Sequence, residues 1–167
     1  GSNPFQKQEK LEVIQGDIYN AVDIENALED VELIVSALGS WGTAKKNVLS
    51  AAMSLIIPAV KVSTCHRIIS LTGADAEALG DKKNIVHRIM RAILHINARR
   101  ILEDGEKHIQ LLEESGLDWS VLRSPIMNNK GNSDIYVVTS RRPYPWQTIN
   151  RASVAKALIS LIGDTTE

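Results

Sequence analysis

The chain has 167 residues, enough for one domain, and its 44% hydrophobic and 23% charged residues are typical of a globular protein. Its 19 Lys and Arg nearly balance its 20 Asp and Glu, giving a net charge of −1. That balance argues against a broad basic surface for nucleic acid or anionic lipid. The single cysteine, Cys65, excludes an internal disulfide framework and the usual cysteine-based zinc sites.

Membrane, metal and export signals are also missing from the sequence. The apolar stretch Val48–Val62 is interrupted by Ser54 and Pro58, and it is too short to span a bilayer. The 4 histidines do not have the spacing of metal ligands, so we expect no metal site. Because no secretory signal begins the chain, we expect a cytoplasmic protein without a membrane partner.

The first third of the chain alternates between strand and helix patterns. Leu11–Gln15 predicts a short strand, which ends at a turn. Asp23 is placed to cap the helix that follows, because its carboxylate can accept free amides of the first turn. The apolar run Leu33–Leu38 predicts a strand buried on both faces, as in a parallel sheet covered by helices. Val48–Val62 predicts a second helix, which Pro58 is expected to kink or end.

The later elements continue this alternation. Arg67–Leu71 predicts another buried strand, and residues 85–114 have a helical pattern that Gly105 is expected to divide into two helices. Gly116 is suited to the left-handed cap of the second of these helices. The remaining elements that we expect are strands at Trp119–Leu122 and Ile135–Thr139 and a final helix at Ala152–Ile162.

This order of elements predicts an α/β fold with a doubly wound parallel sheet, formed by residues 1–167 as a single Rossmann-like domain. In such sheets, ligands bind at the carboxyl ends of the strands. We therefore expect one cleft, lined by the segments that leave four strands: Gly16–Ile18, Ser36–Gly39, Ser70–Thr72 and Pro125–Ile126.

Specific residues also suggest a family. The segments Gln15–Ile18, Val35–Gly39, Ile69–Gly73 and Ser115–Pro125 resemble the NAD(P)H-binding, NmrA-like branch of the atypical short-chain dehydrogenases/reductases. The segment Ser-Gly-Leu-Asp-Trp, followed by Arg and Pro, is the most specific of these. Asn150–Ala155 is similar to the start of the family's last helix, with Ser153 where the family usually has Asp. The resemblance covers nearly the whole chain and implies NADP or NAD as cofactor.

The resemblance also implies positions for the cofactor. Asp17 and Ile18 would lie at the adenine, although Asp17 could equally form only an Asx turn. Ser70 and Thr72 would face the nicotinamide, or else their hydroxyls cap the strand end. Lys107 would reach a ribose or phosphate, or else it is solvated. The remaining expected cofactor contacts are Ser36, Ala37, Leu38 and Gly39 after one strand, with Pro125 and Ile126 forming a wall of the nicotinamide pocket.

Two departures from the family limit what carries over. The chain has no Gly-x-x-Gly-x-x-Gly loop, whose backbone amides hold the pyrophosphate. We therefore expect an N-terminally truncated domain that binds NAD(P) weakly or not at all. The helix before Ser115 also has no Tyr-x-x-x-Lys pair for proton transfer. In Leu102–Gln110, Lys107 and His108 are the only cationic candidates.

These observations favour an NAD(P)H-dependent oxidoreductase that reduces a flavin or quinone or acts on a sugar nucleotide. The alternative is a non-catalytic NmrA-type dinucleotide sensor or protein-interaction module. We expect a small-molecule dinucleotide as partner and no nucleic acid, while a protein partner or a homodimer stays open. Trp119 is expected to pack in the core, whereas Trp41 and Trp146 belong to loops on the ligand side, where a flat substrate could stack on them.

Overall fold

A computed structural model describes residues 10–81 and 84–163 of the chain. Its main sheet has three strands in the order β1-β2-β3: β1 (Leu33–Ser36), β2 (Arg67–Gly73) and β3 (Asp118–Ser124). Both pairings are parallel, with Ser36 opposite Ser70 and Gly73 opposite Ser124. A second, parallel pair joins β4 (Ile126–Asn128) to β5 (Thr148–Asn150). The predicted parallel α/β fold is therefore confirmed.

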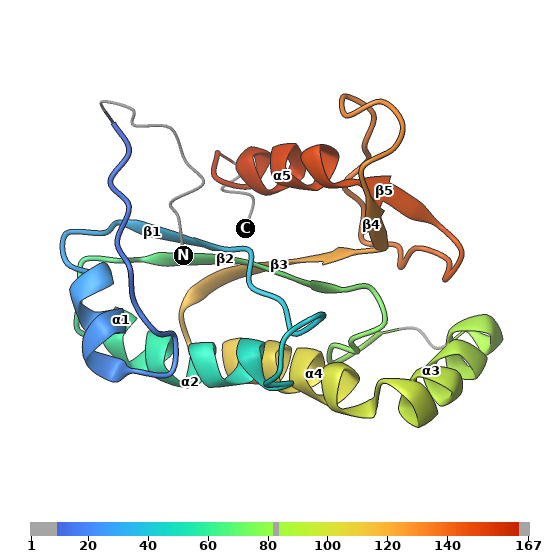
Figure 1. Cartoon of the computed structure of the whole chain (residues 1–167), viewed down its shortest axis with the longest axis horizontal. Helices are drawn as coiled ribbons and strands as arrows, with labels where there is room; N and C mark the ends of the chain where they lie inside the picture. The colour runs from blue at the N-terminus through green and yellow to red at the C-terminus, as the bar shows by residue number, and fades with distance from the viewer. Residues whose placement is uncertain (1–9, 82–83, 164–167) are drawn as a thin grey trace.

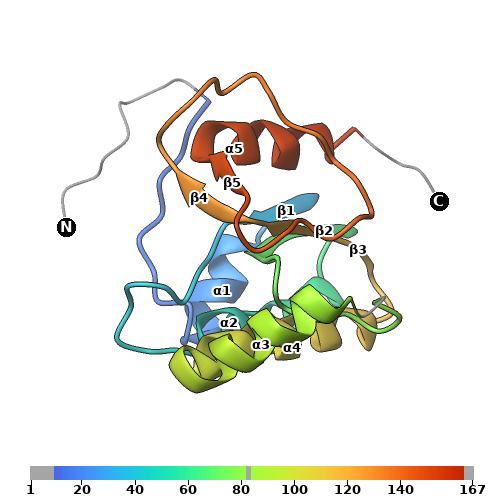
Figure 2. The same cartoon turned by 90° about the vertical axis from the view of Figure 1, so that its right-hand side faces the viewer.

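Helices cover both faces of the main sheet (Figure 1). Three helices lie below it in that view: α1 (Ala21–Ala27), α2 (Val48–Val60) and α4 (Arg99–Glu113). Above it lies α5 (Arg151–Ser160), and α3 (Ile85–Asn97) lies beyond the end of the strands (Figures 1 and 2). This arrangement places the carboxyl ends of all three strands on the side nearest α3.

Two apolar clusters hold the layers together, one on each face of the main sheet. Successive side chains of β2 point to opposite faces, so this strand contributes to both clusters. On the lower face, Ile68 packs with α2 residues and with Leu112 of α4. On the upper face, Ile69 and Leu71 pack against Val154 and Leu158 of α5. Trp119 is partly buried and packs against the lower cluster, as predicted. Cys65 is buried in that cluster, deeper than the half-buried position expected from the sequence.

Two of the expected strands do not form. Leu11–Gln15 is extended without a ladder partner among the described residues, and its side chains are exposed. Ile135–Thr139 also forms no strand, and Ile135 and Val137 are 72% and 82% exposed. A run with strand composition becomes a strand only where a neighbour satisfies its backbone groups. Both segments have the residue composition of a strand, but neither has a partner strand in the described chain.

Two helix boundaries also differ from expectation. Asn20, not Asp23, caps α1, because its side chain accepts the Val22 N–H at 3.0 Å. Asp23 lies inside the first turn and accepts the N–H of Asp17 at 2.7 Å. The break between α3 and α4 falls at Ala98, whereas Gly105 lies within α4.

Other expectations about glycine and proline had mixed outcomes. Gly116 has φ +71, the left-handed conformation predicted after α4. Pro58 does not end α2, which continues to Val60. Gly105 serves a close approach, since a Cβ built on it would lie 2.9 Å from Thr72 Oγ1 and 3.0 Å from the Cβ of Ala76. A glycine in a helical pattern can therefore mark contact with another element as well as a helix end.

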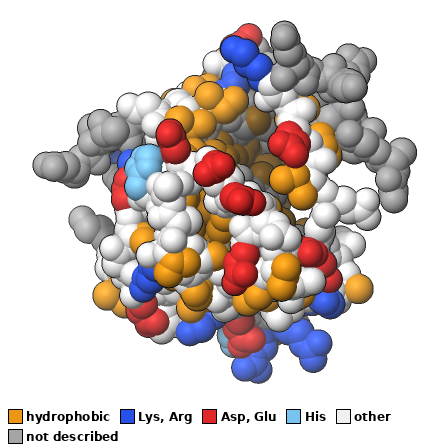
Figure 3. All heavy atoms as spheres, turned by 90° about the vertical axis from the view of Figure 1, so that its left-hand side faces the viewer, with side chains coloured by type: hydrophobic (Ala, Val, Ile, Leu, Met, Phe, Trp, Pro, Cys, Tyr) orange, Lys and Arg blue, Asp and Glu red, His pale blue; other side chains and the backbone are white. Residues whose placement is uncertain are grey.

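One side of the molecule exposes apolar surface. β1 is an edge strand of the described sheet, and Val35 is 41% exposed. Residues before α1 also expose apolar side chains, among them Val13 and Ile14. Figure 3 shows hydrophobic side chains around a hollow in the face at the left of Figure 1. In residues 10–81 and 84–163, no helix is long and apolar enough to cross a membrane.

Candidate functional site

The three parallel strands bring segments far apart in the sequence to one edge of the sheet. β1 ends at Ser36, β2 at Gly73 and β3 at Ser124, and the Ala74 N–H donates to the Ser124 carbonyl at 2.9 Å. Loops that leave this edge carry the ligand site in open α/β sheets. We therefore take the carboxyl edge as the candidate site.

The segment after β1 is open enough to receive a ligand. A Cβ built on Gly39 would meet nothing within 4 Å, so a ligand can approach the backbone there. Ala37 is exposed, and Leu38 packs against the lower apolar cluster instead. The Ser36 hydroxyl is buried and, within the described chain, has no hydrogen-bond partner. A buried hydroxyl without a partner is unusual, because its desolvation is then uncompensated.

Ser70 and Thr72 lie below the sheet and face α4. The Ser70 hydroxyl is fully buried, 2.7 Å from Nε2 of His108. Thr72 is also buried, beside Gly105. These two hydroxyls therefore support the carboxyl half of β2 from below, and neither is exposed at the edge in the described chain.

Successive turns of α4 meet successive lower-face residues of β2. Leu112 shares an apolar cluster with Ile68, His108 bonds to Ser70, and Gly105 lies against Thr72. Two strand residues advance about 6.6 Å and one helical turn advances about 5.4 Å, so the two elements stay nearly in step. Toward the carboxyl edge, the contacts change from apolar to polar.

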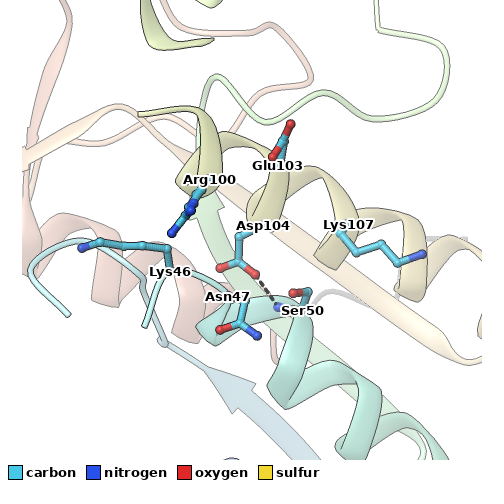
Figure 4. A pocket seen from close by; sticks show the side chains of 7 residues that line it. All are labelled: Lys46, Asn47, Ser50, Arg100, Glu103, Asp104 and Lys107. Atoms are coloured by element: carbon cyan, nitrogen blue, oxygen red, sulfur yellow. Dashed lines mark hydrogen bonds between the residues drawn. The ribbon is translucent and has the colours of Figure 1, made fainter. Parts of the chain in front are cut away.

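Asp104 joins α4 to α2 at this polar end. Its carboxylate is buried and accepts the N–H groups of Leu49, at 3.1 Å, and Ser50, at 2.8 Å, in the first turn of α2 (Figure 4). It also accepts the Ser40 hydroxyl. Asn47, which precedes α2, makes no side-chain cap bond. Asp104 therefore supplies from another helix the cap that α2 lacks locally, and its charge suits that helix end.

His108 is neutral at physiological pH. Burial lowers the pKa of its imidazole to about 4, against a smaller opposing effect of Asp104. Its Nδ1 has no partner among the described residues. A neutral imidazole hydrogen-bonded to Ser70 fixes the orientation of that hydroxyl but carries no charge toward a ligand.

Asp17 and Ile18 lie in the turn before α1. The Asp17 Oδ1 accepts the Tyr19 N–H at 3.0 Å, which is the Asx turn that the sequence had left as an alternative. Its side chain is exposed, so this turn leaves its other oxygen accessible. Ile18 packs against the lower apolar cluster. The Lys45 ammonium lies 3.5 Å from the centre of the Tyr19 ring, which joins this turn to the loop after β1.

The structure does not bring Lys107 to the strand ends. It lies on the exposed side of α4, where its ammonium donates to Gln110 at 3.3 Å, and it points away from Asp104 in Figure 4. It lines a pocket of about 380 Å³ between α2 and α4. Pro125 and Ile126 do follow directly from β3, and Ile126 is 66% exposed.

Sequence reasoning missed the buried polar contacts beneath the edge. Asp104, Gly105 and His108 occupy one face of α4, at the spacing that brings helix residues together. That spacing of an acid, a glycine and a histidine was the available signal. Within the described ranges, no group of three or more His, Cys, Asp or Glu is placed to hold a metal ion.

Comparison with known families decides the class of protein. The profile of the NAD(P)H-binding family matches residues 2–165. The chain belongs to the NAD(P)H-binding family. As an NAD(P)H-binding protein it has the Rossmann-like architecture that the resemblance implied, and its parallel sheet agrees with it. No curated protein matches the chain significantly.

Solved structures share the fold of this NAD(P)H-binding protein at low identity. A short-chain dehydrogenase/reductase from Veillonella parvula is 20% identical with a TM-score of 0.71, over 96% of this chain and 68% of that one. ChuY, an anaerobillin reductase from Escherichia coli, is 16% identical with a TM-score of 0.70, over 90% and 68%. Vestitone reductase from alfalfa is 17% identical with a TM-score of 0.60, over 95% and 59%.

Proposed function

We propose that this protein is an NAD(P)H-dependent reductase whose cofactor lies across the carboxyl edge of β1, β2 and β3. The observation that carries the proposal is the open backbone at Gly39 in the segment after β1, a strand that ends at Ser36, whose buried hydroxyl has no partner in the described chain. Membership of the NAD(P)H-binding family supports the dinucleotide as ligand. Asp17 would accept from the adenine, and Pro125 with Ile126 would wall the nicotinamide side.

The nicotinamide supplies hydride chemistry when bound, while the protein supplies position and surroundings. The backbone at Gly39 would contact the cofactor directly, whereas the buried Ser36 hydroxyl would have to become accessible to do so. Ser70, Thr72 and His108 would keep the strand end rigid from below. We further propose that the pyrophosphate-binding loop belongs to polypeptide outside these 167 residues, because the sequence contains no glycine-rich loop of the family type.

A valine at Gly39 tests this proposal directly. The site is open and its φ is not in the left-handed region, so Gly39→Val should leave the fold unchanged while its side chain fills the ligand's space. We expect NADPH affinity, measured by calorimetry on a chain that carries the pyrophosphate loop, to fall at least tenfold. Gly163→Val is the matched control, because that glycine is equally open but lies at the other end of β2. It follows α5 and its C-cap Leu161, whose carbonyl accepts from Arg67 at the start of β2. Equal NADPH affinity in the two variants would refute the proposal.

A second candidate function is a non-catalytic dinucleotide sensor or protein-interaction module. It is favoured by the outward face of α3, where Ile85, Ile89, Ile93 and Ile96 are 47% to 84% exposed. Exposed apolar stripes of this kind are common at protein interfaces. The absence of tyrosine from α4 also agrees with it. NADPH binding without NADPH oxidation in the presence of menadione or FMN would favour this candidate over the reductase.

A further inference from the structure

Three aromatic rings stack beside the carboxyl edge of the sheet. The rings of His87 in α3 and Tyr144 have centroids 6.1 Å apart and planes within 11°. Tyr144 and Trp146 have centroids 4.8 Å apart and planes within 6°. The two larger rings come from the loop between β4 and β5, so this aromatic stack joins two distant parts of the chain.

Local hydrogen bonds hold the aromatic stack in place. His87 is buried, and its Nε2 donates to the Pro143 carbonyl at 3.0 Å. The Tyr144 N–H donates to Gln147 Oε1 at 2.7 Å, and the Gln147 N–H donates back to the Tyr144 carbonyl at 3.0 Å. Pro143 and Pro145 restrict φ on both sides of the tyrosine. The rings are therefore ordered before any ligand arrives, which lowers the entropy cost of binding.

Arg142 fixes this loop next to the exit of β2. Its Nε donates to the Ala74 carbonyl at 2.9 Å, and its Nη2 donates to the Asp75 carbonyl at 2.7 Å. Ala74 directly follows the last residue of β2. Figures 1 and 2 show the loop before β5 returning at the carboxyl end of β2 and β3, above α3. The aromatic stack therefore lies beside the candidate cofactor site.

One end of the aromatic stack is buried and the other end is exposed to solvent. His87 is 7% exposed, whereas Tyr144 is 44% and Trp146 is 68% exposed. Trp41 is just as exposed, at 69%, but no ring contact joins it to another aromatic residue of the described chain. Only the indole of Trp146 thus continues a series of parallel rings into solvent, where a further flat ring could stack on it.

We propose that Trp146, supported by the stacked ring of Tyr144, binds a flat, conjugated ring system, of the flavin or quinone class, as the acceptor in the reductase reaction. The role of this ring as the acceptor rests on the proposed reductase function. The binding of the ring itself rests only on the geometry of the aromatic stack. A planar conjugated ring extends the series with full overlap, whereas a puckered sugar offers only C–H groups to the indole. The geometry thus favours a flat ring over a sugar ring as the group that stacks on Trp146.

Riboflavin tests the binding site, because its ring fluoresces and carries no phosphate that a cationic side chain could hold. We expect saturable quenching of riboflavin fluorescence by the 167-residue chain. Trp146→Ala should weaken the affinity about tenfold, in line with measured aromatic stacking, while Trp146→Phe should retain most of it. Trp41→Ala is the matched control and should leave the affinity unchanged. Circular dichroism and the Tm of each variant check that the fold is intact.

Several results would overturn the proposal. One is the absence of saturable binding of riboflavin and of menadione to the wild-type chain. Another is equal weakening by Trp41→Ala and Trp146→Ala, and a third is tighter binding of UDP-glucose than of riboflavin at the same site. A separate NADPH titration distinguishes failure of this ring-binding site from failure of the proposed function. Riboflavin binding that depends on Trp146, with no NADPH binding at the strand ends, would retain this site and reject the proposed function.

Discussion

The two halves of β2 rest on the same helix but through different chemistry. At the amino half, Ile68 and Leu112 belong to an apolar cluster that any close-packed α/β protein would contain. At the carboxyl half, the equivalent contacts are Ser70 with His108 and Thr72 with Gly105, next to the buried carboxylate of Asp104. Buried polar groups are stabilising only when they are paired, so their position is specific. The apolar half supplies stability, and the polar half orders the edge where the ligand is expected.

The largest expected effect is the loss of Asp104. Asp104→Ala leaves the amides of Leu49 and Ser50 and the hydroxyl of Ser40 without their acceptor. We expect the free energy of unfolding to fall by about 4 kcal/mol, since each buried donor left unpaired is costly. Urea denaturation measures this. Glu103→Ala, one residue away but in an exposed ion pair with Arg99, should leave the free energy of unfolding almost unchanged, because solvent screens exposed ion pairs. Similar losses in the two variants would contradict the role given to Asp104.

His108 should make the polar half sensitive to acid. Its pKa is about 4 in the folded protein because of burial, whereas an unfolded histidine has a pKa near its ordinary value of 6.5. Below pH 6.5 the unfolded chain therefore binds a proton that the folded chain does not. The stability is complete above pH 6.5, and we expect it to fall by up to about 3 kcal/mol as the pH decreases to about 4.

The difference between wild type and His108→Gln isolates this effect from the titration of carboxylates. Urea denaturation of both proteins between pH 7 and pH 4 is the measurement, and the variant should lose less stability over that interval. His95→Gln replaces an exposed histidine of α3 and should follow the wild-type curve. If the free energy of unfolding depended on pH in the same way in wild type and His108→Gln, the pKa of His108 would not be lowered in the folded protein.

The smallest of these effects concerns the close approach at Gly105. Alanine normally stabilises a helix interior by about 1 kcal/mol relative to glycine. Here its Cβ would lie 2.9 Å from Thr72 Oγ1 and 3.0 Å from the Cβ of Ala76. We therefore expect Gly105→Ala to destabilise the protein by about 1 to 2 kcal/mol, because overpacking outweighs the gain in propensity. A higher Tm in the variant would mean that α4 and β2 are less closely packed than described.

The sequence predicted the three strands of the main sheet because each contains a short run rich in apolar residues. Arg67–Leu71 and Trp119–Leu122 lie within β2 and β3, and the predicted strand Leu33–Leu38 contains β1. Leu11–Gln15 failed as a strand because strand formation depends on a neighbour, and the described chain supplies none. Gly105 was wrongly interpreted as a helix break, since close approach to Thr72 cannot be inferred from α4 alone.

The candidate site was predictable only as a set of strand exits. The parallel order brings the segments after β1, β2 and β3 to one edge, as expected from Ser36–Gly39 and Pro125–Ile126. Ser70 and Thr72 were placed on the right strand, but their side chains face α4 because of the two-residue alternation along β2. The bonds of Asp104 span more than fifty residues of sequence, so the spacing of polar residues in α4 could indicate a buried face but not the partners of Asp104.

NMR tests most directly whether a nicotinamide dinucleotide contacts the carboxyl edge of the sheet, because it also detects weak binding to these 167 residues. NADPH is titrated into the ¹⁵N-labelled chain, and amide shifts are mapped onto the structure. We expect the largest amide shifts on Asp17, Ser36–Gly39, Gly73 and Ile126. Largest shifts at Lys46, Asn47 and Lys107, in the pocket between α2 and α4, would contradict this expectation.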